Sequence, residues 1–153
     1  MAPAERTWST EEERALRLWI ALARAYSTTA RAVAHKVGEY GLTTAQFGIL
    51  EALHHLGPLP LGELAEKLLV TGGNVTYVMD RLEALGFVVR KRSDADRRVV
   101  TAVLTPEGRA LVAAVFPGHA SFVRDLMASL DPDEQEQARD LLKRLGKGIA
   151  ESE

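Results

Sequence analysis

Five basic side chains lie within nine residues in the second half of the chain, at positions 90–98, with two acidic residues among them. Guanidinium and ammonium groups in such a cluster bind phosphates, and guanidinium groups also form paired hydrogen bonds with base edges. The spacing therefore predicts a contact with nucleic acid. The expected contact residues of this segment are Arg90, Lys91, Arg92, Asp96, Arg97 and Arg98.

The residues around this basic cluster are typical of a β-hairpin. Residues 87–92 and 99–104 are rich in β-branched side chains, and the turn formers Ser93, Asp94 and Asp96 lie between them. A basic strand end is also common on a solvated surface that binds nothing. The interpretation therefore depends on the element that precedes the hairpin.

A helix with one polar face is expected immediately before the hairpin. Its apolar residues recur at steps of three and four between Val75 and Leu85, and Gly86 ends it. A shorter helix over residues 61–69 precedes it across a glycine-containing turn at 71–74. Two helices joined in this way form a helix-turn-helix, whose second helix reads the major groove of DNA. The expected contact residues of the polar face and the turn are Thr71, Asn74, Thr76, Tyr77 and Arg81.

Two side chains of this helix have more than one interpretation. Tyr77 could contact DNA or pack against the hairpin, and Asp80 could pair with Arg81 or Arg98 without reading a base. Arg81 and Asn74 have side chains that are able to bind guanine or adenine edges, whereas hydroxyl groups suit phosphates. We expect Tyr77 to contact the DNA and Asp80 to have a structural role.

The chain begins with a long helix. Either Ser9 with Glu12 or Thr10 with Glu13 offers a capping box, and apolar residues keep helical spacing from there to residue 37. A helix that extends over about eight turns buries its apolar face only against a partner. The sequence therefore predicts that this first helix packs against something larger than a small winged helix.

Three further helices are expected. Thr43 and Gln46 form a capping box for a helix over 43–56. A proline at its first position begins a helix over 106–129, in which Pro117 predicts a kink. The last helix is expected to start at residue 131 and carries an apolar stripe.

The composition describes a small globular protein without thiol chemistry. At 153 residues the chain is long enough for one domain, its net charge is −2, and its acidic residues gather at 11–13 and 131–136, away from the basic cluster. The absence of cysteine excludes disulfides and thiolate ligands. Because no apolar run approaches about 18 residues and no signal peptide is recognisable, we expect a cytoplasmic protein without a membrane partner.

Catalytic and metal chemistry find no support in the sequence. It contains no nucleophile elbow, phosphate loop or convincing pair of carboxylates, so an enzyme is not expected. Two of the four histidines, His54 and His55, are neighbours that must lie on different helix faces, and no cysteine completes a metal site. We therefore expect no cofactor and no metal.

The order and spacing of these motifs resemble those of the MarR family of bacterial transcription regulators. The resemblance extends over residues 11–145, and it is the combination of motifs that is specific, since each string alone is common among winged helices. The motifs are Asp96-Arg97-Arg98 followed by Leu104-Thr105-x-x-Gly108, Arg81-Leu82-Glu83-x-x-Gly86-Phe87-Val88-x-Arg90, and Glu63-Leu64-Ala65.

The resemblance implies a mainly α fold with a small β-hairpin, in which a winged helix-turn-helix of residues 42–104 is attached to a helical dimerisation region of residues 9–40 and 106–150. It implies an obligate homodimer that holds two winged helices one DNA turn apart on a pseudo-palindrome. In the family the wing arginine enters the minor groove and an aspartate two residues earlier orients it. These positions correspond to Arg98 and Asp96 here.

The resemblance also implies a cleft for an effector. Part of the family binds small aromatic acids or phenols in a cleft lined by the first, second and fifth helices, whereas a peroxide-sensing branch uses a cysteine near the position of Trp19. The lack of any thiol excludes the peroxide mechanism here. Ordinary core packing is the alternative for each candidate cleft residue. The candidates are Trp19, Tyr26, His35, Phe47, Phe116 and His119.

Together these features predict a ligand-responsive, dimeric repressor that binds a pseudo-palindromic operator in double-stranded DNA and is released by a small aromatic acid or phenol. The alternative is an architectural DNA-binding protein without ligand response, which would show little sequence preference. A ratio of specific to non-specific affinity above about a thousand distinguishes the two.

Overall fold

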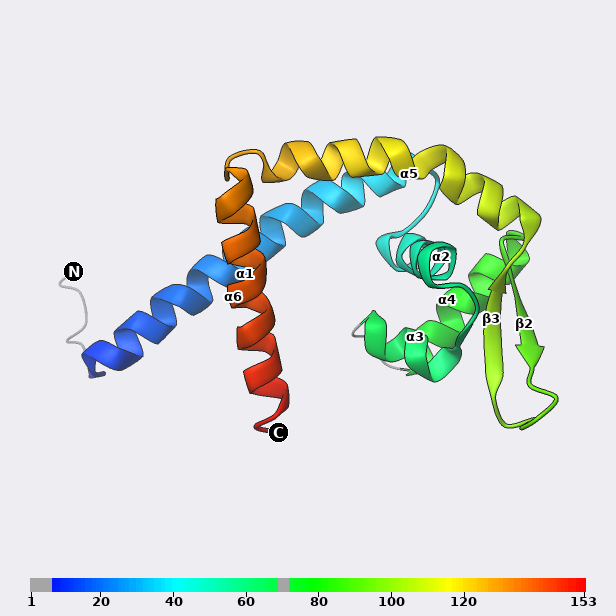
Figure 1. The fold of residues 1–153 in the computed structure, drawn as a ribbon, viewed down its shortest axis with the longest axis horizontal. Helices are drawn as coiled ribbons and strands as arrows, with labels where there is room; N and C mark the ends of the chain where they lie inside the picture. The colour runs from blue at the N-terminus through cyan, green and yellow to red at the C-terminus, as the bar shows by residue number, and fades with distance from the viewer. Residues whose placement is uncertain (1–6, 69–71) are drawn as a thin grey trace.

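The computed structural model describes residues 7–68 and 72–153. It has the mainly helical architecture with a small sheet that the sequence predicts, and a winged helix lies at one end (Figure 1). The elements in chain order are α1 (Thr10–Gly38), α2 (Thr44–Leu56), β1 (Leu59–Pro60), α3 (Leu61–Lys67), α4 (Gly72–Ala84), β2 (Val88–Arg92), β3 (Val100–Leu104), α5 (Pro106–Met127) and α6 (Pro132–Ala150).

Local capping interactions set the starts of the long helices. Of the two candidate boxes at the start of α1, the structure contains the one of Ser9 and Glu12, in which the Glu12 N–H donates to Ser9 Oγ at 3.2 Å and the Ser9 N–H donates to Glu12 Oε2 at 2.6 Å. Thr43 and Gln46 form the expected box at the start of α2. These boxes satisfy backbone donors that the first helical turn leaves without a partner.

The helix-turn-helix differs from the sequence prediction at its turn. The helix α4 already begins at Gly72, so most of the predicted turn at 71–74 is helical. The helix α3 ends at Lys67, and the predicted end at Leu69 lies outside the described residues.

The sheet has three strands where a two-stranded hairpin was expected. β2 and β3 pair antiparallel with Val88 opposite Leu104, and β1 adds a third strand on the other side of β3, with Leu59 opposite Ala102. A strand of two residues has no periodicity to detect. Pro60 is tolerated in β1 because this strand is at the edge of the sheet.

The hydrophobic core lies within the winged helix and extends to the end of α1 and the first half of α5. Among its fully buried members are Val37 of α1, Leu50 of α2, Leu64 of α3, Leu82 of α4 and Val112 of α5. The helix α4 is therefore held by apolar contacts on its inner face. Its outer face is left for polar residues.

The helix α5 continues through Pro117 as one helix. Proline has no N–H to donate to the preceding turn, which predicts a kink, and α5 bends near its middle (Figure 1). The Ser121 hydroxyl donates a hydrogen bond to the Pro117 carbonyl oxygen at 3.1 Å. The bend directs the first half of α5 onto the winged helix.

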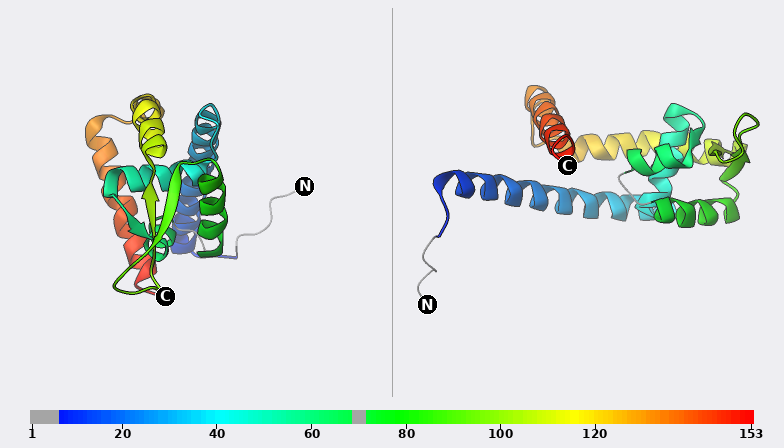
Figure 2. Two further views of the ribbon diagram at one scale, coloured as in Figure 1. Left: turned by 90° about the vertical axis from the view of Figure 1, so that its right-hand side faces the viewer. Right: turned by 90° about the horizontal axis from the view of Figure 1, so that it is seen from below.

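The first half of α1 and the whole of α6 extend away from this core. The two helices cross in Figure 1, but a second view shows them set apart (Figure 2). No residue of α6 is buried. None of the described helices is long and apolar enough to cross a membrane. The large apolar side chains exposed on these two helices are Leu16, Leu18, Trp19, Ile20, Tyr26, Leu141, Leu142 and Ile149.

Candidate nucleic-acid interface

The outer face of α4 presents the polar residues that the sequence places there. Asn74, Thr76 and Arg81 are exposed, and Val75 and Leu82 on the inner face are buried. This division arises because residues three and four apart lie on the same side of a helix. The predicted contact at Thr71 lies outside the described residues.

Tyr77 is exposed on the same helix. Its side chain is 64% accessible, although it could have packed against the hairpin. The ring and its hydroxyl group are therefore accessible to a bound partner such as DNA. The exposure favours the first of the two interpretations.

An arginine held by an aspartate lies at the tip of the wing. Asp96 Oδ1 accepts hydrogen bonds from the Arg98 backbone N–H at 3.0 Å and from Arg98 Nε at 3.1 Å. The side-chain hydrogen bond from Arg98 and then its backbone N–H lower the pKa of Asp96 below its usual value, so the ion pair persists to a lower pH than an isolated aspartate would allow. The Arg98 side chain is 92% exposed, so the guanidinium is oriented without being covered.

The loop that carries this pair is ordered by its own hydrogen bonds. Arg92 Nη1 donates to the Arg97 carbonyl oxygen at 2.9 Å, and the Asp96 N–H donates to Ser93 Oγ at 3.3 Å. Lys91, Arg92 and Arg97 are exposed around it. The result is a projecting loop with several cations on its surface.

Arg90 differs from the other basic residues of the wing. Its side chain is only 23% exposed, and its guanidinium contacts Asp80 at 2.8 Å, Glu83 at 2.9 Å and the Thr76 carbonyl oxygen at 3.0 Å. This geometry favours a structural role over the predicted contact with nucleic acid. The expected partners of Asp80 were wrong, because β2 runs along α4 and brings Arg90 beside it, whereas Arg98 is at the distant tip.

Three of the six candidate cleft residues pack together in the protein. The rings of Phe47 and His119 have centroids 4.6 Å apart, and those of Phe116 and His119 are 6.4 Å apart. Phe47 and His119 are buried. The sequence analysis missed two neighbours in this cluster, since Tyr40 packs on Phe47 and His55 on Phe116. These contacts are those of core packing, the alternative interpretation, but Tyr40 Oη and His119 Nδ1 are buried there without a hydrogen-bond partner among the described residues.

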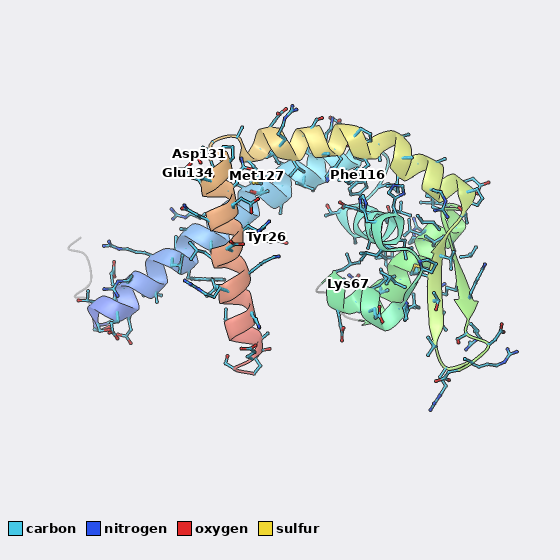
Figure 3. All side chains as sticks on the ribbon, viewed as in Figure 1. Tyr26, Lys67, Phe116, Met127, Asp131 and Glu134 are labelled. Atoms are coloured by element: carbon cyan, nitrogen blue, oxygen red, sulfur yellow. The ribbon has the colours of Figure 1, made fainter. Side chains whose placement is uncertain are left out.

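The other three candidates, Trp19, Tyr26 and His35, are exposed along α1. Positions 19 and 35 are about 24 Å apart at 1.5 Å per residue. Trp19, Tyr26 and His35 line three different hollows of the surface. Tyr26 on α1 and Phe116 on α5 lie apart in Figure 3. Within the described chain the six candidates do not meet in one cleft, so their place in a shared effector cleft stays a prediction.

Tyr26 borders a groove between α1 and the winged helix. The groove has a volume of about 370 Å³, and no Lys, Arg, His, Asp or Glu is among the described residues that line it. Two of its walls are α2 and α4, so a molecule in the groove would touch the inner side of the recognition helix. The lining residues are Tyr26, Thr44, Ala45, Gly48, Ile49, Leu68, Asn74, Val75 and Val78.

Comparison with known proteins places this architecture among transcription regulators. Residues 40–99 match the model of the MarR family. The chain is 37% identical over 134 residues to the HTH-type transcriptional regulator MhqR of Bacillus subtilis, covering 88% of this chain and 92% of that protein. It is 38% identical over 136 residues to the uncharacterized HTH-type transcriptional regulator YkoM of the same organism, covering 89% and 88%.

Solved structures show the same fold. A MarR family transcriptional regulator from Streptomyces coelicolor in complex with DNA matches with a TM-score of 0.83 and 25% identity, over 95% of this chain and 92% of that one. Bordetella bronchiseptica BpsR, whose DNA binding is regulated by 6-hydroxynicotinic acid, matches with a TM-score of 0.77 and 29% identity, over 85% and 98%. The chain therefore belongs to the MarR family, and it is a DNA-binding transcriptional regulator and not an enzyme.

Proposed function

We propose that this protein is a homodimeric repressor in the cytoplasm that binds a pseudo-palindromic operator and is released by a small phenolic compound. The observation that carries the proposal is the combined surface of α4 and the wing, where an exposed polar helix face accompanies an arginine oriented by Asp96. A helix and a wing of this kind read adjacent major and minor grooves.

The proposed contacts divide by their chemistry. Asn74 and Arg81 on α4 have side chains suited to base edges, and Thr76 and Tyr77 have hydroxyl groups suited to phosphates. Thr71 belongs to the same proposed surface. On the wing, Lys91, Arg92 and Arg97 would neutralise phosphates and Arg98 would enter the minor groove.

The dimer is proposed from the apolar surface that the protomer leaves uncovered. Leu18 and Trp19 on α1 and Leu142 and Ile149 on α6 are each more than half exposed. Soluble proteins cover an apolar surface of this extent with a partner. A second copy of the chain supplies the same stripes, so a two-fold arrangement of α1, α5 and α6 covers both. The winged helix of residues 42–104 would then project from a dimerisation region formed by residues 9–40 and 106–150.

The wing contact predicts a specific effect of mutation. Arg98→Ala should weaken binding to a selected operator by about tenfold to a hundredfold, while the melting temperature and the dimer stay unchanged, because the exposed side chain contributes little packing. Fluorescence anisotropy with labelled operator at one salt concentration measures this.

Asp94→Asn is the matched control for Arg98→Ala, since Asp94 is exposed in the same loop and has no part in holding Arg98. It should bind the operator as well as the parent or slightly better. Unchanged affinity of Arg98→Ala would remove Arg98 from the proposed contacts.

The groove beside Tyr26 is the proposed site of the effector. Its volume is of the size that accepts a small aromatic ring. A carboxylate in the groove would find no cation among the described lining residues, and burying an unpaired charge is costly. A neutral phenol is therefore favoured over an aromatic acid. Because α4 forms one wall, a phenol that prefers one position of α4 shifts the population of DNA-binding states.

The effector proposal is tested with a matched pair of compounds. We expect 4-methylphenol, but not 4-methylbenzoate, to bind in calorimetry and to release labelled operator. Ala45→Leu adds volume to the groove lining and should reduce the response to the phenol, while operator binding without the phenol is kept. If a broad panel of phenols fails to bind, this effector site is wrong and the architectural alternative without ligand response gains support. If the benzoate acts equally well, the preference of this groove for a neutral phenol is wrong.

A further inference from the structure

The most extensive ion-pair network of the winged helix, among the described residues, joins the wing to the recognition helix through Arg90. Besides its contacts with Asp80, Glu83 and the Thr76 carbonyl, Arg90 donates its backbone N–H to Glu83 Oε1 at 2.9 Å. Glu83 therefore receives both the backbone and the side chain of the same residue. The Glu83 carboxylate thus holds both the backbone of β2 at residue 90 and the Arg90 guanidinium.

The contacts on α4 follow one side of the helix. Thr76, Asp80 and Glu83 are spaced by four and three residues, and together they span about 10 Å along the axis. A planar guanidinium that binds three points on this line restrains both the rotation of α4 and its position along the axis. The core holds the inner face of α4, and Arg90 holds it from the side of the wing.

The network also changes the charge that the recognition surface presents. The Asp80 side chain is 61% exposed and that of Glu83 is 34% exposed, on a helix that the proposed function brings to DNA. Unpaired carboxylates there would repel phosphates. The neighbouring residue Lys91 lies on the opposite face of the strand and is exposed.

We propose that Arg90 is a positioning residue that determines sequence specificity by fixing the recognition helix relative to the wing, without touching DNA. This inference rests on the proposed function, in which α4 and Arg98 read neighbouring grooves. When α4 and the wing are held at a fixed distance, they select DNA whose major and minor grooves match that distance. Without the contacts of Arg90, α4 and the wing can bind DNA independently of each other. The affinity for the operator should then fall more than the affinity for an unrelated duplex.

The experiment compares Arg90→Met with Lys91→Met, which removes the same charge from the adjacent position. An operator is first selected from random duplexes with the parent protein. Dissociation constants are then measured for the operator and for an unrelated duplex of the same length at several salt concentrations. We expect Arg90→Met to lower the ratio of operator affinity to unrelated-duplex affinity roughly tenfold, beyond the loss that the unpaired carboxylates of Asp80 and Glu83 impose on both duplexes alike. Lys91→Met should weaken both duplexes alike and reduce the salt slope by about one phosphate contact.

Glu83→Gln makes the test sharper, because the two roles of Arg90 predict opposite signs. If Arg90 positions α4, removing the carboxylate should reduce the preference for the operator although the protein becomes less acidic. If Arg90 instead bound a phosphate, freeing it from Glu83 would increase affinity for both duplexes. Glu83→Gln also keeps the shape of the side chain, and it serves where Arg90→Met fails to fold.

The outcomes separate the two proposals. A parent protein with no preference for any selected operator overturns both the proposed function and the role of Arg90. A selective parent, together with Arg90→Met and Glu83→Gln variants that keep its specificity ratio, overturns only the role of Arg90. If the double mutant Arg90→Met, Glu83→Gln loses less of the specificity ratio than the two single mutants together, the role of Arg90 is supported, because coupled residues share one interaction.

Discussion

Gly108→Ala is expected to destabilise the protein by about 3 kcal/mol, although alanine is the better helix former. A Cβ at this position would overlap the Phe87 carbonyl oxygen and lie 2.9 Å from the Phe87 carbonyl carbon. It would also lie 3.2 Å from Leu104 Cδ2. The first turn of α5 therefore packs directly on the backbone that enters the wing, and only a glycine fits.

Neighbouring hydrogen bonds prevent an easy adjustment of this junction. The Thr105 N–H donates to the Phe87 carbonyl oxygen at 3.1 Å, and the Thr105 hydroxyl donates to the Gly86 carbonyl oxygen at 2.6 Å. The backbone that an alanine would displace is thus held by the helix cap itself. Displacement would break the cap as well as the contact.

Thermal and urea unfolding measure the effect. Gly118→Ala is the matched control in the same helix, because a Cβ there meets nothing within 4 Å in the protomer. It should be neutral or stabilising by up to about 1 kcal/mol, as expected for a helix interior. A Gly108→Ala variant as stable as the parent would contradict the close approach of α5 to residue 87.

Leu142→Asp is expected to abolish the proposed dimer and to lower stability by more than about 3 kcal/mol per protomer. The Leu142 side chain is 51% exposed in the protomer, where a polar substitution would change stability by only about 0.5 kcal/mol. A large effect arises only if a partner covers the residue. The protein should then aggregate or unfold, because α6 has no buried residue within its own protomer.

Light scattering coupled to gel filtration, together with thermal unfolding, tests this expectation. Lys143→Asp is the control, since residue 143 is exposed and points about 150° away from the centre of the apolar stripe, at 100° per residue. It should remain dimeric with the melting temperature of the parent. A dimeric and equally stable Leu142→Asp protein would exclude this face of α6 from the interface.

The elements that sequence patterns predicted well are those whose causes are local. The capping box of Thr43 and Gln46 and the glycine at residue 86 act within a few residues of themselves, so their effects follow from spacing alone. The same holds for the alternation of apolar and polar residues along α4. The pairing of Asp96 with Arg98 was expected from the resemblance to the MarR family, and the structure contains it. A helix-turn-helix with a basic wing is therefore predictable from the amino-acid sequence by itself.

The features that sequence patterns missed depend on contacts between distant parts of the chain. The pairing of Leu59 with Ala102 joins residues that are 43 positions apart. A strand of two residues is too short to show the alternation of apolar and polar residues from which a strand is predicted. The six candidate cleft residues share a chemical character but not a place, because a straight helix of 29 residues carries Trp19 and His35 to different surroundings. Arg90 has the same charge as the exposed arginines of the wing. Its different surroundings follow from the packing of β2 beside α4, which places two carboxylates within reach of its guanidinium.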